Sequence, residues 1–127
     1  GTTGNHFFYP RRGDGDNAYN SVTAPFTDDT WHHIAVTLDF ATTTVEMFVD
    51  GTAAPLAVTN ANTMWANVAD PVDWYWGGHT MYTAPFGGRM DELRAANVVR
   101  TPGWVGTEYA NQSAPDMFCA GGPEEAL

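Results

Sequence analysis

Apolar residues recur at every second position in the most regular stretch of the chain, which contains Ile34, Val36 and Leu38. A period of two is typical of a β-strand that turns one face to a core, so we expect a strand over 31–38 with its Ile34 face buried. The next run, which begins at Thr44, predicts a second strand, and Thr42 to Val45 is rich in the β-branched residues that suit a pleated surface. The short polar stretch 39–43 suits a hairpin connection between the two strands.

A tight turn is expected at Asp50-Gly51, because glycine tolerates the positive φ that short hairpins require. A further strand should then run through Ala57 to Thr59. Elsewhere we expect short strands and connecting loops. The strands are expected at 6–9, 19–24, 73–77 and around Met90, and the loops at 10–17, 60–73 and 79–88.

A single helix is predicted near the end of the chain. Thr101 can cap a helix, and Pro102 suits the first helical position. The helical residues expected to face inward are Trp104, Val105 and Tyr109. We therefore place Trp104 in the core, together with Trp31.

Composition limits the chain to one domain. Its 127 residues, 43% of them hydrophobic, are enough for one core and leave no room for a second. We expect the domain to span 1–120 and a tail to follow at 121–127. The only cysteine, Cys119, cannot form an internal disulfide, so cysteine usage does not indicate an oxidising compartment.

The chain is strongly acidic. It has 15 acidic residues against five basic ones, all of them arginine, and a net charge of −10. This field opposes nucleic acid and anionic membranes and leaves cations and neutral ligands as partners. No apolar run approaches about 18 residues, so we expect no membrane insertion. A well-solvated surface in a salty or extracellular setting would explain the same charge.

Four groups of residues resemble a known family. They are Trp-His-His-Ile-Ala at 31–35, Phe-Val-Asp-Gly at 48–51, Gly-Gly at 77–78 and Gly-Arg-Met-Asp-Glu-Leu-Arg at 88–94. Their order and spacing resemble the concanavalin A-like jelly roll of laminin-G-like and pentraxin-like domains in large bacterial surface proteins. The resemblance implies an all-β fold, an antiparallel β-sandwich of the concanavalin A-like lectin/glucanase type with one short C-terminal helix.

The resemblance runs from Trp31 to Phe118, which corresponds to the later half of such a domain. We therefore expect an incomplete sandwich that lacks its N-terminal strands. Open strand edges pair readily with other chains. Other copies of this chain, or a missing N-terminal segment, are thus candidate partners.

The sequence shows no arrangement typical of an enzyme. Glucanases of this fold place carboxylates at alternate positions of one strand, and no Glu-x-Asp-x-x-Glu-like run occurs here. Asp91 and Glu92 are adjacent and would point to opposite faces of a strand. A Gly-x-Ser-x-Gly turn is also missing from the sequence. We expect no enzymatic activity.

Calcium is the candidate metal. The resemblance implies a calcium ion at the rim of the sandwich, with Asp91 as a ligand. Asp14 and Asp16 flank a glycine and could add hard oxygen ligands, although a solvated turn explains them as well. His32 and His33 are neighbours on a predicted strand and would face opposite ways, so we expect no zinc site there.

Candidate ligand-binding residues gather in the long loops and in the strand between them. Sugar rings stack on exposed aromatic rings while nearby polar groups bind the hydroxyls. The candidates are Trp65, Trp74, Tyr75, Trp76, His79 and Tyr82. On a strand Trp74 and Trp76 would share one face and Tyr75 would take the other, so core packing competes for one of these faces.

Together these features favour a non-catalytic binding or adhesion module of a secreted or cell-surface protein. Its partner would be a carbohydrate or a surface protein, with calcium as a candidate requirement. A structural spacer or assembly subunit of an extracellular fibre or surface layer is the alternative, and a glycoside hydrolase-related domain is the third candidate. Exposed aromatic clusters would favour the first, stacked open edges the second, and two facing carboxylates the third.

Overall fold

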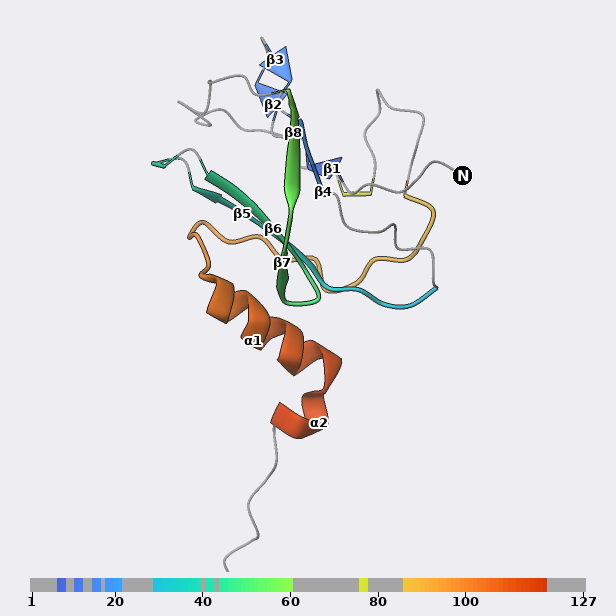
Figure 1. Cartoon of the computed structure of the whole chain (residues 1–127). Coiled ribbons are helices and arrows are strands. Elements are labelled where there is room, and N and C mark those ends of the chain that lie inside the picture. Colours follow the sequence, from blue (N-terminus) through green and yellow to red (C-terminus); the bar gives the residue numbers. More distant parts are fainter. Residues whose placement is uncertain are drawn as a thin grey trace, which may run out of the picture.

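The computed structural model describes residues 7–8, 11–12, 15–16, 18–21, 29–39, 41–42, 44–60, 76–77 and 86–118, with backbone alone in the strands before residue 22 and at 57–60. The described elements are β-strands followed by two helices (Figure 1). Two three-stranded sheets and a two-stranded ribbon account for all the described strands.

The central sheet contains β5 (Ile34–Asp39), β6 (Thr44–Val49) and β7 (Thr52–Ala54) in that order. Both pairs are antiparallel, and β5 pairs with β6 from Ile34↔Val49 to Asp39↔Thr44. The predicted hairpin over 31–49 is therefore confirmed. Its 39–43 connection is stabilised by Asp39, whose Oδ1 accepts the backbone N–H of Ala41 at 2.8 Å.

The turn between β6 and β7 has the predicted two-residue form. Asp50 and Gly51 have φ of 49° and 73°, and Val49 pairs with Thr52 on either side of them. Positive φ at both central residues matches the twist of the flanking strands, which explains why this pair of residues makes the turn.

A second antiparallel sheet contains β1 (Phe7–Phe8), β4 (Ala18–Ser21) and β8 (Leu56–Asn60). Its strands agree with those predicted at 6–9, 19–24 and 57–59. Pro55 alone separates β7 from β8, so the chain passes from one sheet to the other across a residue that has no N–H for a ladder bond. In Figure 1 strand β8 runs from the central sheet up to the second sheet.

The segment predicted as a loop at 10–17 contains a short ribbon. β2 (Arg11–Arg12) pairs antiparallel with β3 (Gly15–Asp16). Together the two sheets and the ribbon supply part of the predicted antiparallel sandwich, and the complete sandwich remains a prediction.

Helix α1 (Pro102–Ser113) begins where the sequence predicted. The Thr101 hydroxyl accepts the backbone N–H of Trp104 at 3.3 Å, and proline occupies the start of the helix. Val105 is 1% exposed and fully buried, as expected. A second, four-residue helix α2 (Pro115–Phe118) follows, so the prediction of a single helix was wrong. Pro115 explains the break between them, because a proline ring clashes with a continuing helix.

The described core lies on both faces of the central sheet. Met47 and Phe48 are consecutive residues that point to opposite faces, and they are 2% and 1% exposed. Phe48 lies opposite Ala35, on the face that His33 shares, and the His33 ring is 6.1 Å from that of Tyr109 in α1. Helix α1 therefore covers the Phe48 face, and the predicted Ile34 face is the opposite one.

Three residues that the sequence predicted to lie in the core are exposed instead. Trp31 and Ile34 are 68% and 45% exposed, because they lie at the end of the sheet beyond its buried centre. Trp104 is 41% exposed, because Val105 and Tyr109 occupy the side of α1 that meets the sheet. Helical side chains point around the axis, so the three predicted inward residues could not all face one way.

No strand forms around Met90, although the sequence predicted one there. Described residues 86–100 belong to no sheet. Glu92 has a φ of 53°, which is incompatible with extended geometry, and its N–H bonds to the Asp91 carboxylate at 2.8 Å. Neither α1 nor α2 has the length and apolar character of a helix that crosses a membrane.

Candidate functional site

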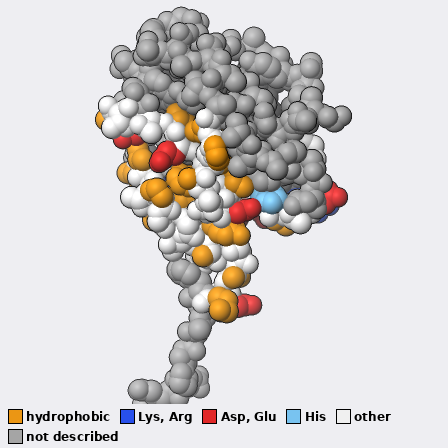
Figure 2. Space-filling model, in the orientation of Figure 1, with side chains coloured by type: hydrophobic (Ala, Val, Ile, Leu, Met, Phe, Trp, Pro, Cys, Tyr) orange, Lys and Arg blue, Asp and Glu red, His pale blue; other side chains and the backbone are white. Residues whose placement is uncertain are grey.

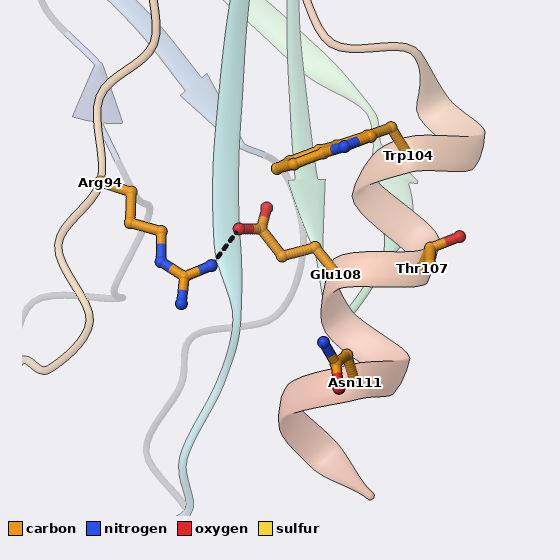
Figure 3. A pocket seen from close by; sticks show the side chains of 5 residues that line it. All are labelled: Arg94, Trp104, Thr107, Glu108 and Asn111. Atoms are coloured by element: carbon orange, nitrogen blue, oxygen red, sulfur yellow. Dashed lines mark hydrogen bonds and ion pairs between the residues drawn. The ribbon is translucent and has the colours of Figure 1, made fainter. Parts of the chain in front are cut away.

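A shallow hollow of about 160 Å³ opens between α1 and the 86–100 segment that precedes it (Figure 3). Four of its residues come from α1 and one from the segment. They are Trp104, Thr107, Glu108, Asn111 and Arg94. Thr107 and Glu108 each lie three or four positions from both Trp104 and Asn111, so the four side chains share one side of α1.

Glu108 lies at the centre of this hollow. Its side chain is 13% exposed, and its Oε1 accepts a hydrogen bond of 2.8 Å from Nη1 of Arg94. Oε2 lies 3.9 Å from Nε2 of His33, which precedes β5 and is also 13% exposed. The carboxylate therefore connects the helix, the central sheet and the 86–100 segment.

Arg94 is held from two sides. Its Nη2 donates to Oε2 of Glu92 at 2.7 Å, while Nη1 bonds to Glu108. The hydrogen bond to Glu92, followed by that to Glu108, raises the pKa of Arg94 above its ordinary value. The guanidinium is thus a fixed cation at the edge of the hollow, although its side chain is 58% exposed.

Trp104 supplies the apolar wall. The guanidinium carbon of Arg100 lies 4.4 Å from the centre of its ring, a cation–π contact. Figure 3 shows the ring beside the Glu108 carboxylate, and the ring also lines the hollow. An exposed indole next to a carboxylate and a guanidinium can bind a ligand that has both an apolar face and polar groups.

Thr107 and Asn111 complete the lining. The Thr107 hydroxyl donates to the carbonyl oxygen of Gly103 at 2.9 Å, which is a bond within the helix. Asn111 is exposed, and Figure 3 shows its amide at the end of the hollow away from Trp104. Its amide offers donors and an acceptor to a ligand.

A second polar group joins the start of β5 to the β6–β7 turn. Asp50 Oδ2 lies 2.8 Å from Nδ1 of His32, and its Oδ1 accepts the backbone N–H of His33 at 3.0 Å. The two histidines precede β5, and their rings have different neighbours. Within the described ranges no three His, Cys, Asp or Glu side chains are grouped closely enough to hold a metal ion.

Most of the candidate residues from the sequence lie outside the described part of the chain. Trp65, Trp74, Tyr75, His79 and Tyr82 lie outside the described residues, as does Asp14. Trp76 is described in a bend and is 48% exposed.

Asp16 belongs to the ribbon strand β3, where only the backbone is described. Asp91 is exposed and uses Oδ1 to accept the N–H of Glu92. The calcium site remains a prediction.

The hydrophobic pattern of the sequence places Trp104 in the core and therefore does not predict the hollow. A signal was present, because Trp104, Glu108 and Asn111 recur at intervals of four and three on a predicted helix. The contribution of Arg94 could not be foreseen, since it depends on how the 86–100 segment passes α1.

Comparison with protein families matched the chain over residues 1–106 to a family of the laminin G type, described as the concanavalin A-like lectin/glucanases superfamily. Comparison with curated proteins and with solved structures gave no match. The family match covers most of the chain, so the chain belongs to this superfamily, as its sequence motifs indicated.

Proposed function

We propose that this member of the concanavalin A-like lectin/glucanase superfamily is a non-catalytic carbohydrate-binding module of a secreted or cell-surface protein. The family suggests carbohydrate binding or adhesion in general terms. The observation that supports carbohydrate in particular is the position of Trp104. Its partly exposed ring borders a hollow that also holds a guanidinium, a carboxylate and an amide.

These groups match the two kinds of surface on a sugar. The C–H face of a pyranose can stack on the Trp104 ring, while Arg94, Glu108 and Asn111 exchange hydrogen bonds with its hydroxyls. Glu92 and Glu108 hold Arg94 in place before any ligand arrives. Less conformational freedom is then lost on binding, which favours affinity. The shallow shape suits an extended saccharide that lies across the surface.

The same geometry supports a role without catalysis. A glycoside hydrolase needs two carboxyl groups that face each other across room for the scissile bond. Glu92 and Glu108 instead bind the same guanidinium, so Arg94 occupies the space between them. Calcium at Asp91 remains part of the proposal, as an aid to stability or to binding at the rim.

The alternative role, as a spacer or assembly subunit, is favoured by a different observation. Several large apolar residues of the 86–100 segment are about half exposed, and Figure 2 shows orange hydrophobic patches across the visible described surface. These residues are Phe86, Met90, Leu93, Val98 and Val99. An apolar surface of this kind can contact another protein.

A glycan array with and without a calcium chelator tests the proposal. We expect binding to at least one glycan class, weakened about tenfold by Trp104→Ala, the effect of losing one stacking contact. Trp31→Ala is the matched control, because Trp31 is also exposed but lies outside the hollow. If the folded protein binds no glycan, the assembly role is favoured. If both variants lose glycan binding equally, the glycan site is not the hollow at Trp104.

A further inference from the structure

Both terminal nitrogens of Arg94 already bond to carboxylates. Nη1 binds Glu108 and Nη2 binds Glu92, at 2.8 and 2.7 Å. Arg94, Glu92 and Glu108 together carry one net negative charge, because two carboxylates outweigh one guanidinium. Each terminal nitrogen of Arg94 keeps a second N–H, and its side chain is 58% exposed, so a ligand can still bond to it. An acidic ligand there would nevertheless meet the net negative charge of the group, and Glu108, only 13% exposed, is poorly screened by water.

A cationic ligand group would instead find an acceptor in the Glu108 carboxylate. Glu108 Oε2 has no hydrogen bond among the described residues, and Nε2 of His33 lies 3.9 Å from it. The Trp104 ring lies beside this carboxylate in Figure 3. The ring already attracts one cation, since Arg100 stacks on it at 4.4 Å. An ammonium group in the hollow would therefore find a carboxylate oxygen and an electron-rich ring together.

The charge of the whole chain acts in the same direction. A net charge of −10 draws cationic ligands toward the protein and repels acidic ones. This long-range field cannot by itself select a ligand, because it acts on any cation. The local pairing of Glu108 with Trp104 adds the directional contact that distinguishes one saccharide from another.

We infer that the hollow beside Trp104 prefers saccharides that carry a free, protonated amine over neutral or acidic saccharides with the same backbone. The inference rests on the proposed carbohydrate-binding function and specifies its ligand class. Glu108 is the residue that determines the preference, and Trp104 provides the stacking surface. The net negative charge of Arg94 together with Glu92 and Glu108 accounts for the discrimination against acidic sugars.

Three forms of one oligosaccharide test this preference by calorimetric titration of the whole chain. A short glucosamine oligomer carries amines, its N-acetylated form is neutral and its N-sulfated form is acidic. We expect the amine form to bind roughly threefold to tenfold more tightly than the neutral form, the range that one cation–π contact and one exposed ion pair support. The acidic form should bind most weakly.

Glu108→Gln should remove the preference for the amine form while the neutral form still binds. Glu46→Gln is the matched control, because it removes the same charge from an exposed residue of β6 outside the hollow. If both variants reduce the preference equally, bulk charge explains it and the inference fails. If Glu108→Gln unfolds, raising the pH until the amine loses its proton provides the test in the native chain, with the neutral oligomer as reference.

The outcomes separate this inference from the function on which it rests. Binding of the neutral or the acidic oligomer at least as tightly as the amine form would overturn the amine preference and leave carbohydrate recognition intact. Failure of all three oligomers to bind, together with a negative glycan array, would overturn both.

Discussion

Gly51 and Tyr109 lie so close that glycine alone fits at the turn. A Cβ built on Gly51 would lie 2.9 Å from Cδ1 of Tyr109, and the φ of Gly51 is 73°. The β6–β7 turn therefore meets α1 through its backbone. This close approach brings the helix, and with it Glu108, against the sheet at His33.

Gly51→Ala should consequently destabilise the protein. Alanine at positive φ costs about 1–2 kcal/mol, and the contact with Tyr109 adds to that cost. The measurement is the free energy of unfolding from a denaturant titration. Gly103→Ala is the control, because no atom lies within 4 Å of its Cβ position and alanine favours the helix. A Gly51→Ala variant as stable as the control would show that the turn and helix can separate at little cost.

Asp50→Asn should loosen the connection between the turn and the start of β5. Asparagine tolerates the positive φ of Asp50 but loses the charge that binds Nδ1 of His32 and the N–H of His33. We expect a loss of about 1–3 kcal/mol, typical of hydrogen bonds to a charged group. Asp29→Asn serves as control, since Asp29 is exposed and has a φ of 56°. Thermal unfolding of both variants measures the difference.

Phe48→Ala tests which residues form the core. Phe48 is 1% exposed, so its truncation should cost about 3–5 kcal/mol. Ile34→Ala on the neighbouring strand should cost much less, because Ile34 is 45% exposed. Equal losses would mean that Ile34 itself is covered in solution, as the hydrophobic pattern suggests.

Asp39 should make stability depend on pH in the acid range. The hydroxyl of Thr42, followed by the N–H groups of Ala41 and Thr42, lowers the pKa of Asp39 below 3.8. A carboxyl whose folded pKa is depressed stabilises the protein above its unfolded pKa and loses that effect as the pH falls. The Tm advantage over Asp39→Asn should therefore be complete above pH 3.8 and shrink below it. A Tm difference that is constant with pH would contradict this.

Local signals in the sequence predicted the main strands before residue 60 and the helix start, but not the absence of a strand around Met90 or the bend at 76–77. Alternation around Ile34, the positive-φ turn at Asp50-Gly51 and the cap at Thr101 each depend on residues close together in the chain. Such local structure follows from the backbone preferences of individual residues and from the spacing of apolar side chains along the chain. The motifs around these elements also indicated the superfamily, which the match over 1–106 confirmed.

Packing between distant segments could not be predicted from those signals. The sequence placed Trp104 in the core, but the contact of α1 with Gly51 turned Val105 and Tyr109 inward and left the indole at the surface. The strand expected around Met90 did not form, because Glu92 adopts a positive φ and Arg94 binds Glu108 instead of a sheet neighbour. The chain by itself thus determined its turns, caps and family, whereas the hollow at Trp104 exists only because tertiary contacts bring residues 94, 104 and 108 together.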